Sequence, residues 1–138
     1  MKKPEVYQRN LNGFTLPELL VVLVIIGILL LIALPNLMPL ISKAKSTEAQ
    51  MQLNHLYTLE KNYFYMHSKY SNDLNMVDYI QEKLVTQNGN ANYQITITEA
   101  SVNSFKAKAT SVVDFDGDGI FNVWEIDQDN KLTETVKD

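Results

Sequence analysis

Three closely spaced aspartates near the carboxyl end are the residues best suited to chemistry. Asp114, Asp116 and Asp118 lie in the run DFDGDG, in which a glycine follows each of the last two aspartates. Carboxylates at alternate positions around a glycine turn direct hard oxygen ligands toward one centre. Calcium takes about six to eight such oxygens. The spacing therefore predicts a calcium site with these three carboxylates as ligands.

The residues that complete this site are less determined. With Glu125, the run fits the pattern D-x-D-x-D-G-x₅-E of an EF-hand calcium loop at every specified position, residues 114–125. An EF-hand has helices on both sides, whereas these flanks have the pattern of strands. In an extended chain Glu125 lies about 20 Å beyond the last glycine. We expect the Ile120 carbonyl as a further ligand and keep Glu125 as a second candidate. Asp127 and Asp129, across the next turn, are the alternative to Glu125.

Calcium would have a structural purpose in this chain. The sequence has no cysteine, which excludes a disulfide and a thiolate zinc site as staples. About a hundred residues are left to form a soluble core, and a domain of that size buries only roughly 60–65% of its unfolded surface. A calcium ion would supply the missing staple. The alternative is that the acidic loop is a solvated turn without a metal.

Catalysis finds little support in the sequence. The two histidines, His55 and His67, are twelve residues apart, which on one helix separates them by about 18 Å along the axis. They therefore cannot share a metal or a substrate. The sequence has no cysteine nucleophile, glycine-rich phosphate loop or serine elbow. We predict that the protein is not an enzyme.

The charge distribution excludes two further classes. The formal net charge is −4, and the first 13 residues have a balance of +2 from Lys2, Lys3 and Arg9 against Glu5, which leaves −6 for the remainder. Nonspecific binding of nucleic acid needs a basic face, and so does a surface that lies on anionic lipid. An acidic body therefore predicts no direct nucleic-acid partner.

The stretch from Phe14 to Leu34 is long and apolar enough to cross a bilayer. It contains 21 residues with a single charge, Glu18, and a helix of that length spans about 30 Å. A secretory signal has a shorter apolar region and a small-residue cleavage site. The basic residues before the stretch predict that the carboxyl-terminal body lies outside the inner membrane.

Glu18 does not fit a simple membrane anchor. An unpaired carboxylate inside a bilayer costs on the order of 2–3 kcal/mol or more. If the chain were cut after Gly13, the new amine of Phe14 would lie about one helical turn from Glu18 and would provide a positive partner. The alternative is that Glu18 lies at the interface and reaches water.

These residues carry a family resemblance. A short basic leader ends in Gly13, Phe14-Thr15-Leu16-Pro17-Glu18 follows, and Gly27 and Pro35 lie at the middle and the end of the apolar helix. This pattern, over residues 2–36, resembles the prepilin signature of type IV pilins and type II secretion pseudopilins. The resemblance implies that a prepilin peptidase cuts between Gly13 and Phe14 and methylates Phe14. It also implies that Glu18 guides assembly by pairing with the terminal amine of a neighbouring subunit.

The resemblance further implies partners and a location. The chain would polymerise with copies of itself and related pilins, through an assembly platform in the inner membrane. It would be a single-pass inner-membrane protein before assembly and part of a periplasmic or cell-surface filament afterwards. Pilus, pseudopilus and DNA-uptake filament stay open at this point. The contrasting hypothesis is a monomeric, membrane-tethered module that binds calcium or another ligand.

The remaining pattern predicts the fold. A helix is expected from Pro17 to about Met66, and its second half carries an apolar stripe that is interrupted by Glu60. Alternating patterns predict strands at residues 93–98, 105–110, 120–126 and 131–135, and a short helix is expected over residues 76–84. The prediction is an α+β fold, in which a helix with a transmembrane half and an amphipathic half packs on a small antiparallel sheet. We divide the chain into a leader (1–13), a transmembrane or filament-core helix (14–40) and a globular domain (41–138).

Overall fold

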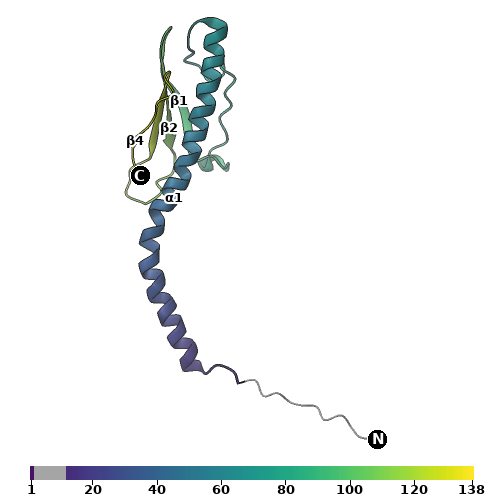
Figure 1. Cartoon of the computed structure of the whole chain (residues 1–138), viewed down its shortest axis with the longest axis vertical. Helices are drawn as coiled ribbons and strands as arrows, with labels where there is room; N and C mark the ends of the chain where they lie inside the picture. The colour runs from purple at the N-terminus through teal and green to yellow at the C-terminus, as the bar shows by residue number, and fades with distance from the viewer. Residues whose placement is uncertain (2–11) are drawn as a thin grey trace. The chain divides into compact units, whose positions relative to one another are not determined.

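A computed structural model describes Met1 and residues 12–138, apart from the side chain of Met38. Most of the predicted leader lies outside the described residues. The elements are a long helix, a short 3₁₀ helix and four strands: α1 (Leu16–His67), η1 (Val85–Gln87), β1 (Tyr93–Ala100), β2 (Phe105–Ser111), β3 (Val123–Asp127) and β4 (Leu132–Val136) (Figure 1). The chain forms two compact units, Met1–Asn36 and Leu37–Asp138, which are described separately.

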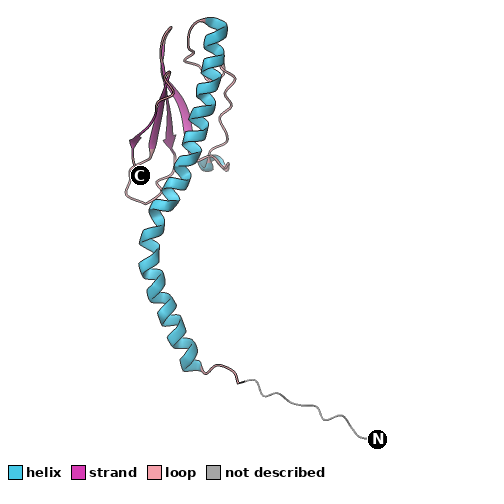
Figure 2. Cartoon of the chain, in the orientation of Figure 1, coloured by secondary structure: helices cyan, strands magenta, loops and turns pink. Residues whose placement is uncertain are grey.

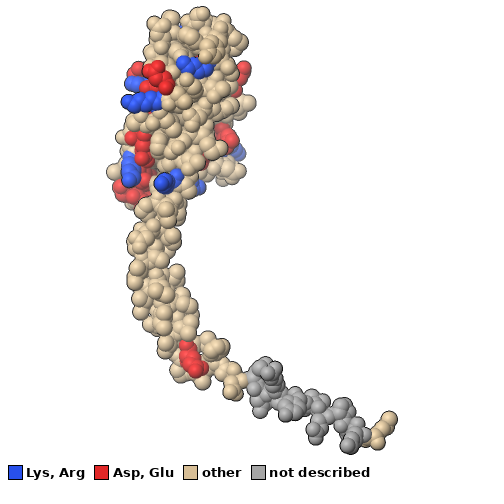
Figure 3. Space-filling model, in the orientation of Figure 1, with Lys and Arg blue, Asp and Glu red and all other residues tan. Residues whose placement is uncertain are grey.

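The first unit is the apolar part of α1. All residues from 14 to 36 are exposed in the single chain. The helix contains a window with a mean hydropathy of 3.0, none of it buried, which by length and composition is sufficient to cross a membrane. Figure 3 shows this part without charged side chains except for an acidic group near its start. Apolar surface of this extent requires a lipid or protein environment.

The second unit begins with the remainder of α1, which buries one face. Ala49, Leu53 and Leu56 are fully buried, and Tyr57, Tyr63 and Phe64 are among the partly buried residues packed against the same core. The spacing of three and four residues places these side chains on one side of the helix. The predicted apolar stripe is therefore confirmed. Glu60 lies within it and is itself fully buried.

The four strands, magenta in Figure 2, form an antiparallel sheet. Their order is β1-β2-β3-β4, a meander. Two small residues of β2, Ala107 and Ala109, are fully buried and pair with Ile126 and Trp124 on β3. Phe105, at the start of β2, is buried in the same core as Leu53 and Leu56 of α1. The predicted α+β fold, with the amphipathic helix packed on a small sheet, is confirmed.

The prediction of a helix over residues 76–84 was wrong. Residues 74–78 form a turn and residues 79–83 have no regular structure. Asp73 Oδ1 accepts from the backbone N–H of Asn75 at 2.9 Å, and Asp78 has a positive φ of 58°, which is incompatible with a continuing helix. Val77 and Tyr79 are buried, whereas the residues between and after them are exposed. Burial at every second residue is typical of extended chain.

The side chain of Gln81 occupies the free edge of β1. Gln81 Oε1 accepts from Ile95 N at 2.8 Å, and Gln81 Nε2 donates to Tyr93 O at 3.1 Å. The amide of one side chain thus replaces the backbone of a neighbouring strand. An edge strand whose backbone groups are satisfied in this way offers fewer sites to another chain.

Among the strand boundaries, the start of β3 differs most from the expectation. Strand β3 begins at Val123, whereas the sequence predicted a strand from Ile120. The three preceding residues belong to the end of the acidic loop, because the N–H of Ile120 donates to Asp118 Oδ1 at 2.7 Å. The side chains of the loop therefore set where the strand can start.

Candidate metal-binding loop and assembly helix

The three predicted aspartates lie together in the connection between β2 and β3. Asp114 accepts two backbone N–H groups, from Gly117 to Oδ1 at 2.6 Å and from Gly119 to Oδ2 at 2.7 Å. Asp116 Oδ1 accepts from Asp118 N at 3.0 Å. These bonds fold the loop back on its own carboxylates, so that the aspartates are held near one point.

Glycine is required at two positions of this loop. Gly117 and Gly119 have φ values of 84° and 86°, in the left-handed region that side chains with a Cβ rarely adopt. Each follows an aspartate in the sequence. The glycines therefore allow the reversals that bring alternate carboxylates to one side.

A fourth carboxylate joins the cluster from the end of the chain. One oxygen each of Asp114, Asp116, Asp118 and Asp138 lies within 4.8 Å of the others. Oxygens that share a calcium ion at 2.3–2.6 Å are separated by up to about 5 Å. Asp138 is 20 residues past Asp118, so no local motif in the sequence indicated it.

Asp138 is fixed by two contacts and leaves one oxygen unused. Its Oδ2 accepts from Phe115 N at 3.0 Å, and its backbone carbonyl accepts from the hydroxyl of Ser42 on α1. Among the described residues, Asp138 Oδ1 is buried without a hydrogen-bond partner. A buried oxygen in this state is costly unless a cation or water satisfies it.

The four charges affect one another. The N–H of Gly119, more than any other group, lowers the pKa of Asp114. The pKa of Asp116 is raised: the N–H of Asp118 opposes this, but partial desolvation and the charges of Asp118, Asp138 and Asp114 together outweigh it. The repulsion is the expected consequence of clustering carboxylates without a cation.

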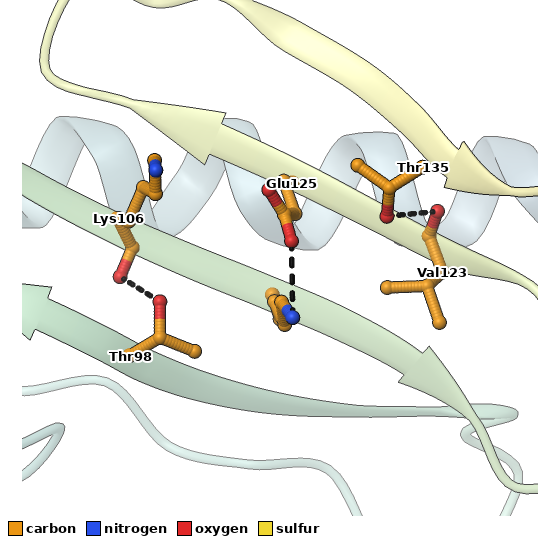
Figure 4. A network of polar contacts seen from close by, with 6 residues as sticks. Thr98, Lys106, Val123, Glu125 and Thr135 are labelled. Carbon is orange, nitrogen blue, oxygen red and sulfur yellow. Dashed lines mark hydrogen bonds and ion pairs between the residues drawn. The ribbon is translucent and has the colours of Figure 1, made fainter.

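The structure does not bring Glu125 into this cluster. Glu125 lies on β3 opposite Lys108 of β2, and the two side chains form an ion pair of 3.1 Å between Nζ and Oε1 (Figure 4). Both are partly exposed, so the pair adds little stability. Glu125 therefore pairs with Lys108 on the sheet and does not join the aspartates of the loop.

The other predicted candidates occupy separate positions. Asp127 and Asp129 lie at the opposite end of β3 from the acidic loop, and Asp127 Oδ1 accepts the backbone N–H groups of Asp129 and Lys131 at 3.0 Å each. Asp127 therefore stabilises the turn between β3 and β4. Ile120 lies at the end of the loop, and its carbonyl stays a predicted ligand.

The predicted assembly residues lie at the start of α1. Thr15 donates to Glu18 Oε2 from its backbone N–H at 2.6 Å and from its hydroxyl at 2.8 Å. Glu18 thus accepts an N–H group at the helix start that has no partner within the helix. An open groove at the helix start is lined by Glu18 and by five apolar residues: Phe14, Pro17, Leu19, Val21 and Val22. Gly13 and Phe14 precede the helix and are exposed.

Comparison with known proteins identifies the family. The family model of the prokaryotic N-terminal methylation motif matches residues 8–34. The chain is 41% identical over 72 residues to the type IV major pilin protein PilA of Myxococcus xanthus, covering 52% of this chain but only 33% of that protein. It is 34% identical over 98 residues to the type IV wide pilus major component PilA4 of Thermus thermophilus, covering 70% of this chain and 71% of that protein. The chain therefore belongs to the type IV pilin family and is a structural subunit with a processing motif at its amino terminus, not an enzyme.

Proposed function

We propose that this chain is cut between Gly13 and Phe14 by a prepilin peptidase, methylated on Phe14, and assembled with copies of itself into a surface pilus. The observation that carries the proposal is the fully exposed apolar part of α1. Before assembly the inner membrane covers this surface, and after assembly the same helices of neighbouring subunits do so. An assembly platform in that membrane and related minor pilins would be the further partners.

The relatives favour a pilus over a secretion pseudopilus. Both are named as major components of type IV pili, and one of them aligns with most of the chain. We therefore place this chain as a shaft subunit at the cell surface. Filaments sheared from intact cells and rich in this protein are expected. Retention of all the protein in the periplasm would instead indicate a pseudopilus.

Processing is tested by the intact mass and the amino-terminal sequence of the protein recovered from its own cells. We expect a chain that starts at N-methylated Phe14. A chain that still starts at Met1 in cells with active peptidase contradicts the proposal and favours the membrane-tethered monomer.

Glu18 would fix the register of assembly. In the single chain its carboxylate accepts from Thr15, and we propose that in the filament it pairs with the Phe14 amine of a neighbouring subunit. Glu18→Ala should abolish filaments while membrane insertion and cleavage stay normal. Thr15→Ala is the matched control, because it removes the hydroxyl partner but keeps the carboxylate. Unchanged filament yield for Glu18→Ala would exclude the pairing.

We also propose that the acidic loop binds calcium. The ligands would be the carboxylates of Asp114, Asp116 and Asp118 with the Ile120 carbonyl. Two observations support a cation at this point: the carboxylate oxygens are clustered, and Asp138 Oδ1 has no hydrogen-bond partner within the described part of the chain. Bound calcium would neutralise repelling charges and hold the loop between β2 and β3. Its affinity would suit the extracellular range of about 10⁻⁴–10⁻³ M.

The calcium proposal is tested by thermal unfolding of the full chain in detergent. Chelator should lower the Tm of the unaltered protein, and calcium should restore it. Asp116→Ala should remove the response, whereas Asp129→Ala, at the turn beyond β3, should keep it. An unaltered protein whose Tm is the same in chelator and in calcium has only a solvated acidic turn.

A further inference from the structure

The last residues of the described chain lie at a junction of three segments. After β4, Asp138 contacts the acidic loop through Phe115 N and contacts α1 through the hydroxyl of Ser42. Ser42 is buried at 6% exposure, and it lies six residues after Asn36, where the apolar unit ends. Asp138 thus joins the loop to this part of α1, next to the contact that Asn122 Oδ1, at the end of the loop, accepts from the Ser46 hydroxyl at 3.5 Å.

The carboxylate of Asp138 is held in a position that is unfavourable without a cation. One of its oxygens lies within 4.8 Å of oxygens from Asp114, Asp116 and Asp118, and Oδ1 has no hydrogen-bond partner among the described residues. The only described ion pair is on the sheet, between Lys108 and Glu125, so no described lysine or arginine neutralises the cluster. Like charges at this separation repel, and a buried oxygen without a partner adds to the cost.

We propose that Asp138 is the fourth carboxylate ligand of the calcium ion, and that the ion thereby fastens the carboxyl-terminal segment to the loop and to α1. This inference rests on the proposed calcium site and adds a ligand that lies outside the loop. With calcium bound, Asp138 keeps its contacts to Phe115 and Ser42. Without calcium, repulsion from the three loop aspartates moves Asp138 away and both contacts are lost.

We call this calcium-dependent contact of Asp138 with Phe115 and Ser42 the latch. It would act at a specific place in the pilin. It joins the segment after β4 to α1 next to the part of the helix that enters the membrane or the filament core. Calcium outside the cell would therefore fix the carboxyl-terminal segment at the position where the globular domain and the apolar helix meet along the chain. The calcium concentration would then decide whether a subunit has a closed or an open carboxyl-terminal segment.

The Phe115 amide provides a direct readout, because its described acceptor is Asp138 Oδ2. We would measure amide exchange by NMR on the ¹⁵N-labelled full chain in detergent, together with calcium titration by calorimetry. In the unaltered protein, calcium should slow exchange of the Phe115 amide at least tenfold. Asp138→Asn should weaken calcium binding about tenfold and remove this protection. Asp129→Asn removes the same charge outside the cluster and should change neither quantity.

Asp116→Asn separates failure of the latch from failure of the site. If Asp116→Asn abolishes calcium binding but Asp138→Asn binds calcium as the unaltered protein does, the site stands and the latch is wrong. If calcium binds but leaves the Phe115 amide unprotected in the unaltered protein, the latch is also wrong, and this result needs no variant. If the unaltered protein binds no calcium, both proposals fail. Magnesium, which demands a near-ideal octahedral site, should give at most weak protection.

Discussion

The hydroxyl of Tyr93 donates a 2.8 Å hydrogen bond to Asn122 Oδ1, and both side chains are fully buried. The bond joins β1 to the end of the acidic loop. Asn122 Nδ2 in turn donates to Glu134 Oε1 at 2.7 Å and to Val136 O at 3.0 Å. One amide therefore connects the first strand, the loop and the last strand. The position of the loop is set by this buried network and not by the loop alone.

Asn122→Ala should destabilise the protein by about 2 to 3 kcal/mol, because it leaves the Tyr93 hydroxyl and the Val136 carbonyl without their partner. The measurement is urea unfolding of the full chain in detergent. Asn103→Ala, at an exposed site in the β1–β2 turn, serves as the control and should change stability little. A loss below about 0.5 kcal/mol for Asn122→Ala would show that the network is not stabilising.

Gln81→Ala should expose the edge of β1. It removes the two hydrogen bonds to Tyr93 O and Ile95 N, which we expect to cost about 1 to 2 kcal/mol. An uncovered edge also pairs more readily with another chain, so aggregation on warming should begin at a lower temperature. Gln128→Ala, whose side chain bonds only within an exposed turn, is the matched control. Equal aggregation of the two variants would argue against edge protection by Gln81.

Alkaline pH should unfold the protein through its buried tyrosines. Burial, before any other cause, raises the pKa of Tyr79 and of Tyr93 to about 12, from 10.0. The folded state holds these protons more tightly than the unfolded state. The resulting stability is fully present below pH 10 and is lost as the pH rises toward 12. Absorbance of tyrosinate, followed with circular dichroism between pH 9 and 12, should show that some tyrosines ionise only at high pH, together with unfolding.

Tyr93→Phe should make the alkaline loss of stability smaller. An unchanged loss would contradict its origin in the buried tyrosines.

Glu60 should make the protein less stable at neutral pH than at mildly acidic pH. Its side chain is fully buried, Oε2 accepts from Ser71 N at 3.1 Å, and Oε1 has no partner in the described part of the chain. Burial raises the pKa of Glu60, and the hydrogen bond from Ser71 opposes this only in part. A raised pKa in the folded state gives stability that is present below pH 4.5 and is lost as the pH rises through the folded-state pKa.

Glu60→Gln removes this titration and keeps the shape of the side chain. Relative to the unaltered protein, the variant should gain stability as the pH rises from 4.5 to 7.5, because its neutral amide cannot ionise inside the core. Urea unfolding in chelator at the two pH values measures the difference. Glu99→Gln, an exposed residue on β1, should show no such gain. Parallel pH dependence of Glu60→Gln and the unaltered protein would locate the titration elsewhere.

Most of the fold was predictable because its signals are local. The apolar run that follows Phe14, the stripe that contains Leu53 and Leu56, and the alternation along β1 and β2 each depend on residues a few positions apart. The helix expected over residues 76–84 failed for the converse reason. Val77 and Tyr79 bury alternate side chains against the core, and Gln81 bonds to β1. These tertiary contacts favoured extended chain over the weak helical tendency of the segment.

Residue types along the chain were enough to find the amino-terminal motif, the apolar helix and the three loop aspartates, since each is a pattern of neighbouring residues with one physical consequence. The packing of the chain was needed to find which distant groups contact them. It brought Asp138 to the loop, paired Glu125 with Lys108 on the sheet, and buried Glu60 inside the stripe. This difference arises because charges and hydrogen bonds act across space over a few ångströms. The pairing of strands and the packing of α1 fix those distances, and they are not encoded in the spacing of residues along the chain.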